Sequence, residues 1–178
     1  FSDCNSLNDI TALEKWNVSN GNNFAGMLQG CSSLKKLKGL ENWNVSNNAK
    51  FHYMFSNSYS LNDIKPLENW NVSNGIDFSA MFYNCCSLPS LKAVEKWNVS
   101  NGINFSCMFY KCSKIKDLHG LEKWDVSNGN YFSKMFYLCT NLKDINSLKK
   151  WNVSKGTEFK SMLFIHWNKL PKPNIKLQ

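Results

Sequence analysis

Cysteine and histidine are the side chains of this sequence that could act as nucleophiles or hold a metal ion. The chain of 178 residues contains seven cysteines and three histidines. No two histidines have the i, i+4 spacing that places both on one face of a zinc-binding helix, since they stand at positions 52, 119 and 166. A cysteine beside a histidine could form a thiol nucleophile, but no pair is singled out. We therefore expect no catalytic activity, no metal and no cofactor.

Five of the cysteines recur at intervals of 27 residues or a multiple of 27, and Ser58 and His166 stand at the same place: Cys4, Cys31, Cys85, Cys112 and Cys139. Thiols on neighbouring turns of a repeat could lie within disulfide range. A small buried apolar side chain would fit equally well. Because serine also occurs at this place, a disulfide is not obligatory, and we expect free, buried thiols.

The spacing of the cysteines belongs to a repeat of constant length. Its unit begins at a tryptophan, and no interval contains an insertion: Trp16, Trp43, Trp70, Trp97, Trp124 and Trp151. We call the residues at equivalent places of successive units a column and name it by its first member. A constant period predicts one structural unit stacked repeatedly, here an α/β repeat solenoid. We expect the array over residues 1–164, with a truncated first unit at 1–15, and a C-terminal cap at 165–178.

Each unit is expected to contain a short strand and a short helix. Trp16 and Val18 alternate with Asn17, as in an extended segment. Gly21 and its equivalents, with asparagine as the single replacement, indicate a left-handed turn. The apolar residues from Phe24 to Leu34 have the spacing of one helical face, which predicts about two helical turns.

The stretch that follows this segment has leucines three residues apart, at Leu34, Leu37 and Leu40 in the first full unit, and we call it the leucine run. It is expected to be a tight turn that ends in a short strand. Pro66 and Pro89 stand in it and exclude a long helix. The Asn17 column could form a ladder of side-chain amides between neighbouring turns. Five of its members are also formal glycosylation sequons, but we favour the structural role because a sugar on every turn would obstruct the stack.

The unit L-x-x-L-x-x-L-E-x-W-N-V-S-N-G-x-x-F-x-x-M-F-x-x-C-x-S-L resembles the BspA-like branch of the leucine-rich-repeat proteins. The similarity rests on W-N-V-S-N, on M-F-x-x-C-x-S-L and on the leucines that follow, and it covers essentially the whole chain. The resemblance implies a curved leucine-rich-repeat stack. It also implies a cell-surface or secreted protein that binds partners, often in adhesion to host or neighbouring cells.

The charge of the chain restricts its partners. The formal net charge is +8, and all 21 basic residues are lysines. Arginine, which reads phosphates and guanine edges through its planar fork, is absent, so we do not expect nucleic-acid binding. No apolar run approaches the roughly 18 residues that span a membrane. No signal peptide is visible, but the chain begins in the middle of a unit, so we give this absence little weight.

Two sets of variable residues are candidates for the binding face. In leucine-rich repeats the residues between the leucines face the concave side, and the resemblance thereby nominates a largely basic set: Lys35, Lys38, Lys65, Lys92, Lys116, His119 and Lys143. The second candidate is a stripe of aromatic residues one unit apart, Tyr83, Tyr110 and Tyr137, since aromatic residues are enriched in protein interfaces. Simple solvation of the lysines and packing of the tyrosines on the next unit are the alternatives.

We expect a monomeric, non-enzymatic binding module, extracellular or on the cell surface, whose ligand is a protein or a glycan on a host or neighbouring cell. The alternative is a cytoplasmic scaffold or effector module of the same architecture, because the cysteines show no clear disulfide pattern.

Overall fold

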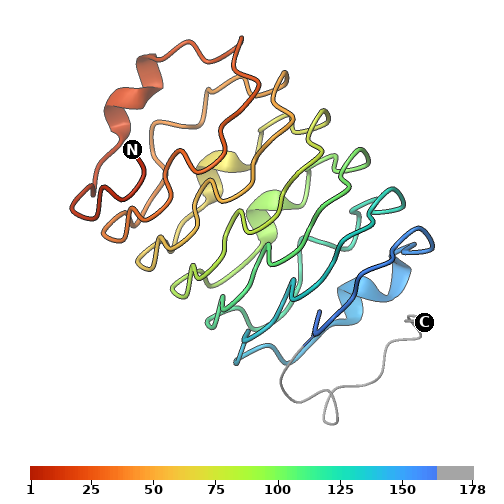
Figure 1. Cartoon of the computed structure of the whole chain (residues 1–178). Helices are drawn as coiled ribbons and strands as arrows, with labels where there is room; N and C mark the ends of the chain where they lie inside the picture. The colour runs from red at the N-terminus through yellow and green to blue at the C-terminus, as the bar shows by residue number, and fades with distance from the viewer. Residues whose placement is uncertain (164–178) are drawn as a thin grey trace.

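The computed structural model describes residues 1–163. Successive units lie side by side as coils along one axis, with the N-terminus at one end (Figure 1). Isolated parallel bridges join equivalent residues of neighbouring coils, for example Lys50 with Asp77 and Asp77 with Asn104. The curved leucine-rich-repeat class stays a prediction. The expected cap at 165–178 and the end of the array at 164 lie outside the described residues.

The core is a set of stacked columns. Trp43 lies 6.4 Å from Trp70 between ring centroids, with the two rings within 2° of parallel. Phe51 lies 5.4 Å from Phe78 in the same way. These separations fall in the range of favourable aromatic pairs. Each coil therefore buries its large side chains against their equivalents in the neighbouring coils.

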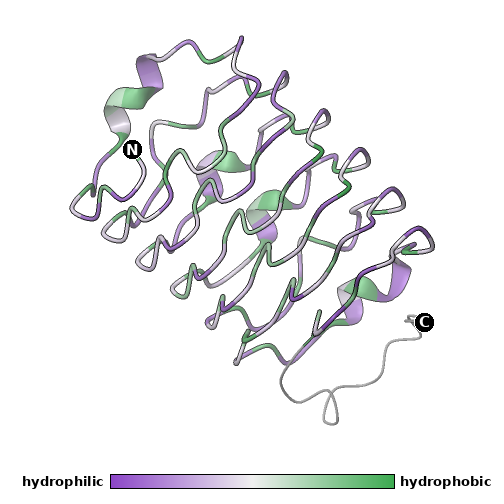
Figure 2. Cartoon of the chain, viewed as in Figure 1, coloured by the Kyte–Doolittle hydropathy of each residue, from purple (hydrophilic) through white to green (hydrophobic). Residues whose placement is uncertain are grey.

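Polar and apolar residues alternate around each coil (Figure 2). In the second full unit Trp43 and Val45 are buried, while Asn44 between them is exposed. This confirms the predicted alternation at the start of the unit. The short segment is not part of a paired strand, however. Within residues 1–163, five bridges between coils fall at the Asn23 column, seven residues further on, and one joins Lys36 with Asp63.

Buried side-chain donors connect each coil to the one before it. Trp97 Nε1 donates to the carbonyl oxygen of Leu67 at 2.9 Å, and its equivalents do the same from Trp43 to Trp151. The Cys85 thiol donates to the carbonyl of Phe55 at 3.1 Å. In the one described coil without a cysteine here, the Ser58 hydroxyl donates to the carbonyl of Leu28. Serine and cysteine are interchangeable in this column because both are small hydrogen-bond donors.

The helix expected from Phe24 to Leu34 is absent, and so are its equivalents within residues 1–163. Alternate backbone N–H groups instead donate to the next coil, as Phe51 does to Asp77 at 2.8 Å and Phe55 to Met81 at 2.9 Å. A helix would have used these donors internally. Tight turns with left-handed residues such as Tyr53, at φ 58°, also place the apolar side chains inward.

The Gly21 column is not left-handed, contrary to the sequence-based expectation. In the coils that have glycine there, the lack of a side chain leaves room for the phenylalanine three residues on; Asn48 is the one other residue of the column. A Cβ on Gly75 would stand 2.3 Å from the Phe78 ring and 2.9 Å from the carbonyl oxygen of Val72. Apart from Gly39 and Gly120, the left-handed residues of the described chain lie in the Gly26 and Gly30 columns, most of whose members are not glycine.

The amide ladder also lies in another column than expected. Asn17 Oδ1 accepts from the backbone and hydroxyl of Ser19 within its own coil. The bonds between coils come from the Asn20 column, where Asn101 Nδ2 donates to the carbonyl of Ser73 at 2.8 Å. Steric obstruction of the stack therefore gives no reason against modification of the exposed Asn17 column.

The leucine run takes two forms. Four coils form a 3-10 helix here: η1 (Thr11–Lys15), η2 (Lys65–Leu67), η3 (Lys92–Val94) and η4 (Asn146–Lys150). Two others have glycine in the middle of the run, Gly39 and Gly120, with φ of 106° and 108°. In these two, the carboxylate of Glu41 or Glu122 accepts the glycine N–H. The strand expected to end this run is absent from both forms.

The left-handed backbone at non-glycine residues leads to a stability prediction. Lys111 is exposed and has φ 57°. Because a side chain costs about 1 kcal/mol in this region, we expect Lys111→Gly to raise the free energy of unfolding by about that amount. Urea denaturation measures the change.

The matched control is Lys114→Gly, three residues away and equally exposed, where φ is not positive. Glycine there should lower the free energy of unfolding by about 0.5–1 kcal/mol, because it only adds freedom to the unfolded chain. Equal effects of the two substitutions would contradict the assigned backbone conformation.

Candidate functional site

The Lys38 column forms an exposed row along the stack. Lys38, Lys65 and Lys92 are all exposed, and Lys65 and Lys92 begin η2 and η3. Three residues further along each coil is a glutamate, giving a parallel row that the sequence analysis did not single out: Glu41, Glu68, Glu95 and Glu122. The constant glutamate in the repeat was the available signal. We call the surface of these two rows over the first three full coils the lysine–glutamate face.

Two adjoining hollows lie on this face. The first has a volume of about 340 Å³ and lies between Lys38 and Glu41 on one coil and Lys65 and Glu68 on the next. The second, of about 470 Å³, uses Lys65 and Glu68 again and reaches Lys92. Because the hollows share residues, they form one groove across three coils. Its volumes fall in the range of about 300–1,000 Å³ typical of ligand sites.

The groove carries unpaired charges of both signs. Within residues 1–163, Lys38, Lys65 and Lys92 form no ion pair, and neither does Glu68. Glu41 is used to accept the Gly39 N–H, at 2.6 Å. Glu95 pairs with Lys123 at 3.1 Å. The groove is thus a mixed-charge surface rather than the purely basic one that the lysines alone suggested.

The other predicted lysines lie beside this groove or further along the stack. Lys35, Lys116 and Lys143 are exposed in one column. The backbone of this column joins coils, since the carbonyl of Lys116 accepts from the Lys143 N–H at 2.8 Å. In the second full coil this column has Asn62, and the acidic residue after it, Asp63, has a structural role. Its Oδ1 accepts the N–H of Lys65 at 2.9 Å.

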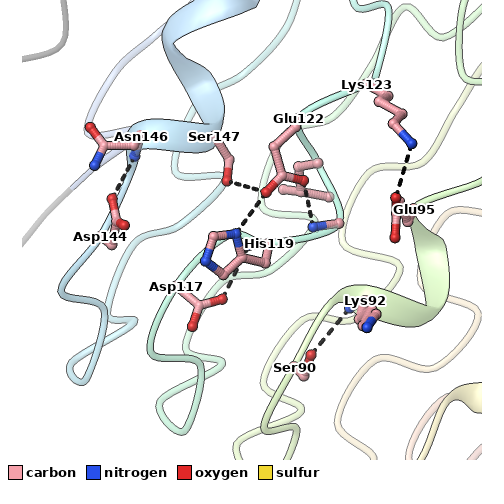
Figure 3. A network of polar contacts seen from close by, with 12 residues as sticks. Ser90, Lys92, Glu95, Asp117, His119, Glu122, Lys123, Asp144, Asn146 and Ser147 are labelled. Carbon is pink, nitrogen blue, oxygen red and sulfur yellow. Dashed lines mark hydrogen bonds and ion pairs between the residues drawn. The ribbon is translucent and has the colours of Figure 1, made fainter.

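His119 replaces lysine in the fourth full coil and belongs to a hydrogen-bonded cluster (Figure 3). Its Nδ1 lies 2.7 Å from Glu122 Oε1, and the Ser147 hydroxyl donates to the same oxygen at 3.0 Å. Partial burial opposes ionisation of Glu122, but the bonds from His119, Gly120 and Ser147 outweigh it and lower its pKa to about 2. The carboxylate in turn raises the pKa of His119. Ser147 contacts the glutamate and not the imidazole, so this cluster is no nucleophile–base pair.

The predicted tyrosine stripe is a stack of rings. The centroids of Tyr83 and Tyr110 are 4.5 Å apart, and those of Tyr110 and Tyr137 are 5.3 Å apart, all nearly parallel. Burial, and then the neighbouring Tyr110, raises the pKa of Tyr83. Because the rings cover one another, the stripe presents ring edges and hydroxyls rather than faces. The tyrosines pack on each other, not on a helix of the next unit.

All seven cysteines are free thiols. Burial raises the pKa of Cys139 to about 12, and it raises the pKa of Cys85 and Cys112 as well. A thiol that stays protonated is a poor nucleophile. Within the described part of the chain, no group of three His, Cys, Asp or Glu could hold a metal ion. No helix among the same residues has the length and apolar character to cross a membrane.

Comparisons with known proteins give one family. The model of a family described as Mycoplasma protein of unknown function, DUF285, matches residues 1–117 and 63–172. No curated protein matches. Among solved structures, an internalin from Listeria monocytogenes is 13% identical with a TM-score of 0.24, over 86% of this chain and 50% of the internalin. The chain spans half the length of that internalin, and so low a TM-score carries no argument.

The His119 cluster makes a prediction about pH. We expect an NMR titration to give His119 a pKa above its ordinary value of 6.5, because Glu122 favours the charged ring. The stabilisation from this pair is complete between about pH 4.5 and 6.5. It is lost as the pH rises through the raised pKa of His119, and also as the pH falls through the lowered pKa of Glu122, which is about 2. Glu122→Gln should lower the pKa of His119. A pKa at or below 6.5 in the native chain would contradict the geometry of the cluster.

Proposed function

The chain belongs to the DUF285 family, and from that premise we propose that it is a non-enzymatic repeat protein that binds a partner protein through the lysine–glutamate face. The observation that carries the proposal is the groove across three coils, with unpaired Lys38, Lys65, Lys92 and Glu68 on its walls. The backbone beneath is tied to the following coil by the indole bonds to the carbonyls of Leu40, Leu67 and Val94. Binding to such a preorganised surface costs little conformational entropy.

The partner is a segment that carries both charges. A polyanion would meet Glu68 as well as the lysines, and a polycation would meet the lysines. Each mismatch leaves like charges side by side, which disfavours the wrong partner. We place the module outside the cell or on its surface, as the BspA-like resemblance implies, and we take the groove to be the concave side of a curved leucine-rich-repeat stack. An adhesive role, with a protein or glycan on a host or neighbouring cell as ligand, is part of this proposal.

The test is a triple substitution in the groove, Lys38→Glu, Lys65→Glu and Lys92→Glu. The immobilised chain is first exposed to cell-surface and matrix extracts and to cytosolic extract, and the affinity of the captured protein is then measured. We expect the triple variant to bind it at least about tenfold more weakly, because three attractive contacts become repulsive.

The matched control changes three exposed lysines elsewhere to glutamate: Lys111, Lys114 and Lys160. It shifts the net charge equally and should leave affinity nearly unchanged at physiological salt. Equal losses in the two triple variants would show only an effect of overall charge and would refute the groove. Circular dichroism checks that the triple variant is folded. If it is not, the single variant Lys65→Glu is used in its place to measure the loss of binding.

A second candidate function is an intracellular scaffold, which the seven free thiols favour because disulfides are typical of exported proteins. Titration of thiols in the unfolded chain, isolated without reductant, distinguishes the two. Seven reactive thiols are expected from an intracellular protein. A stable disulfide would count against the scaffold, and capture of a partner from cytosolic extract alone would favour it.

A further inference from the structure

A third hollow lies on another part of the coils and shares no residue with the two hollows of the lysine–glutamate groove. Its volume is about 440 Å³, and it spans four coils. It is lined by the amides of three asparagines, by two isoleucines and by one lysine: Asn74, Asn101, Asn128, Ile76, Ile103 and Lys155. We call it the amide groove.

The asparagines of the amide groove are held in fixed orientation. Asn74 Nδ2 donates to the carbonyl of Ser46 at 2.7 Å, and Asn101 and Asn128 donate to the equivalent serine carbonyls at 2.8 Å. Each side-chain amide has two N–H donors and an oxygen acceptor, so one donor and the acceptor of Asn74 and Asn101 remain after this bond, while the oxygen of Asn128 already accepts from Lys155. Neighbouring coils joined by backbone hydrogen bonds lie about 4.8 Å apart. The groove therefore presents donor and acceptor pairs at a constant repeat along the stack.

The isoleucines are the apolar part of the groove. Ile76 and Ile103 are 45% and 41% exposed, and they stand in one column on neighbouring coils. The same column has Asn22 and Ala49 before them and Asn130 and Thr157 after them, and the last two bond each other at 2.7 Å. The two large apolar side chains of this column therefore lie on the first two of the four coils that line the groove. Burial of the two by a ligand would remove the exposed apolar surface.

The charge of the groove indicates the class of ligand. Lys155 is its one charged lining residue, and its ammonium already lies 2.6 Å from Asn128 Oδ1. This contact shows that the outer oxygens of the asparagine column accept hydrogen bonds from a donor in the groove. The rest of the lining is neutral, and a neutral chain of hydroxyl groups would meet amides and an apolar surface there.

We propose that the amide groove binds an extended, neutral β-1,4-linked glycan that runs along the axis of the stack. A sugar residue in such a glycan advances along its chain by about the rise of one coil. Successive sugars would then meet successive asparagines, with alternate sugars turned over so that opposite edges of the ring face the amides in turn. The hydroxyls would bond to the amides, and the C–H faces of the sugar rings would pack on Ile76 and Ile103. An α-1,4-linked glycan curls and cannot hold this register over several coils.

The experiment is a titration of the whole chain with cellohexaose and, in parallel, with maltohexaose, followed by NMR and calorimetry. We expect cellohexaose to bind with a dissociation constant of about 1 mM or below, and maltohexaose at least about tenfold more weakly. The signals that shift should include the side-chain amides of Asn74 and Asn101.

The matched variant is Ile76→Ala with Ile103→Ala, since Ala49 is the natural occupant of this column in the preceding coil. We expect it to weaken cellohexaose binding at least about fivefold, while Lys65→Glu in the other groove leaves it unchanged. Absence of cellohexaose binding, equal binding of the two sugars, or binding that survives the isoleucine substitutions would each overturn the proposal. None of these outcomes bears on the lysine–glutamate groove, because the two sites share no residue.

Discussion

The structure depends on buried hydrogen bonds that pass from the side chains of one coil to the backbone of the coil before it. An indole nitrogen and a thiol or hydroxyl in each coil donate to carbonyl groups of the coil before, as Trp97 and Cys85 do. These carbonyls also accept one backbone N–H within their own coil, as Leu67 does from Trp70. The buried indole N–H groups would be costly to leave without an acceptor. The bonds join residues 30 apart, which is one unit and one tight turn. A unit of another length would move the donors away from these carbonyls, so the bonds explain why the repeat tolerates no insertion.

This constraint leaves the outer surface free to vary. Side chains such as Lys38 and Ile76 make no bond that holds two coils together, and they change from coil to coil within their columns. Backbone amides and the side chains of the Asn20 column carry the joining bonds at the surface. Two grooves of different chemistry can therefore lie on one stack, one of mixed charge and the other neutral, without either disturbing the core.

The sequence predicted the registered columns and the burial of Trp43 and Val45 because burial follows from periodicity. It failed over Phe24 to Leu34, since the spacing of a helical face is also the spacing of inward residues in successive tight turns. Only the neighbouring coil, which takes the alternate N–H groups, decides between the two. The same limit explains why the sequence analysis placed the ladder of side-chain amides in the Asn17 column, whereas the structure has it in the Asn20 column. Both columns are equally regular in the sequence, and only the distance to the preceding coil separates them.

Among the candidate residues, the lysines were found at the surface as expected, but the glutamates that give the groove its second charge were overlooked. Their column hardly varies, which is typical of a structural position, and Glu41 and Glu122 do have a structural role, since both accept a glycine N–H. Glu68 keeps the same place in a coil that has Pro66 instead of glycine, where this bond is not needed. Its carboxylate is left for other contacts, which no periodic pattern reveals.

The two forms of the leucine run give the array a way to diversify. Whether a coil makes a 3-10 helix or a left-handed turn depends on one residue, as Gly39 and Ala93 illustrate. Exchange of glycine for another small residue alters the path of the backbone beside the Lys38 column while the unit keeps its length. Duplication of such a unit followed by a point mutation at this one position would thus generate new arrangements of the same charges on an unchanged core.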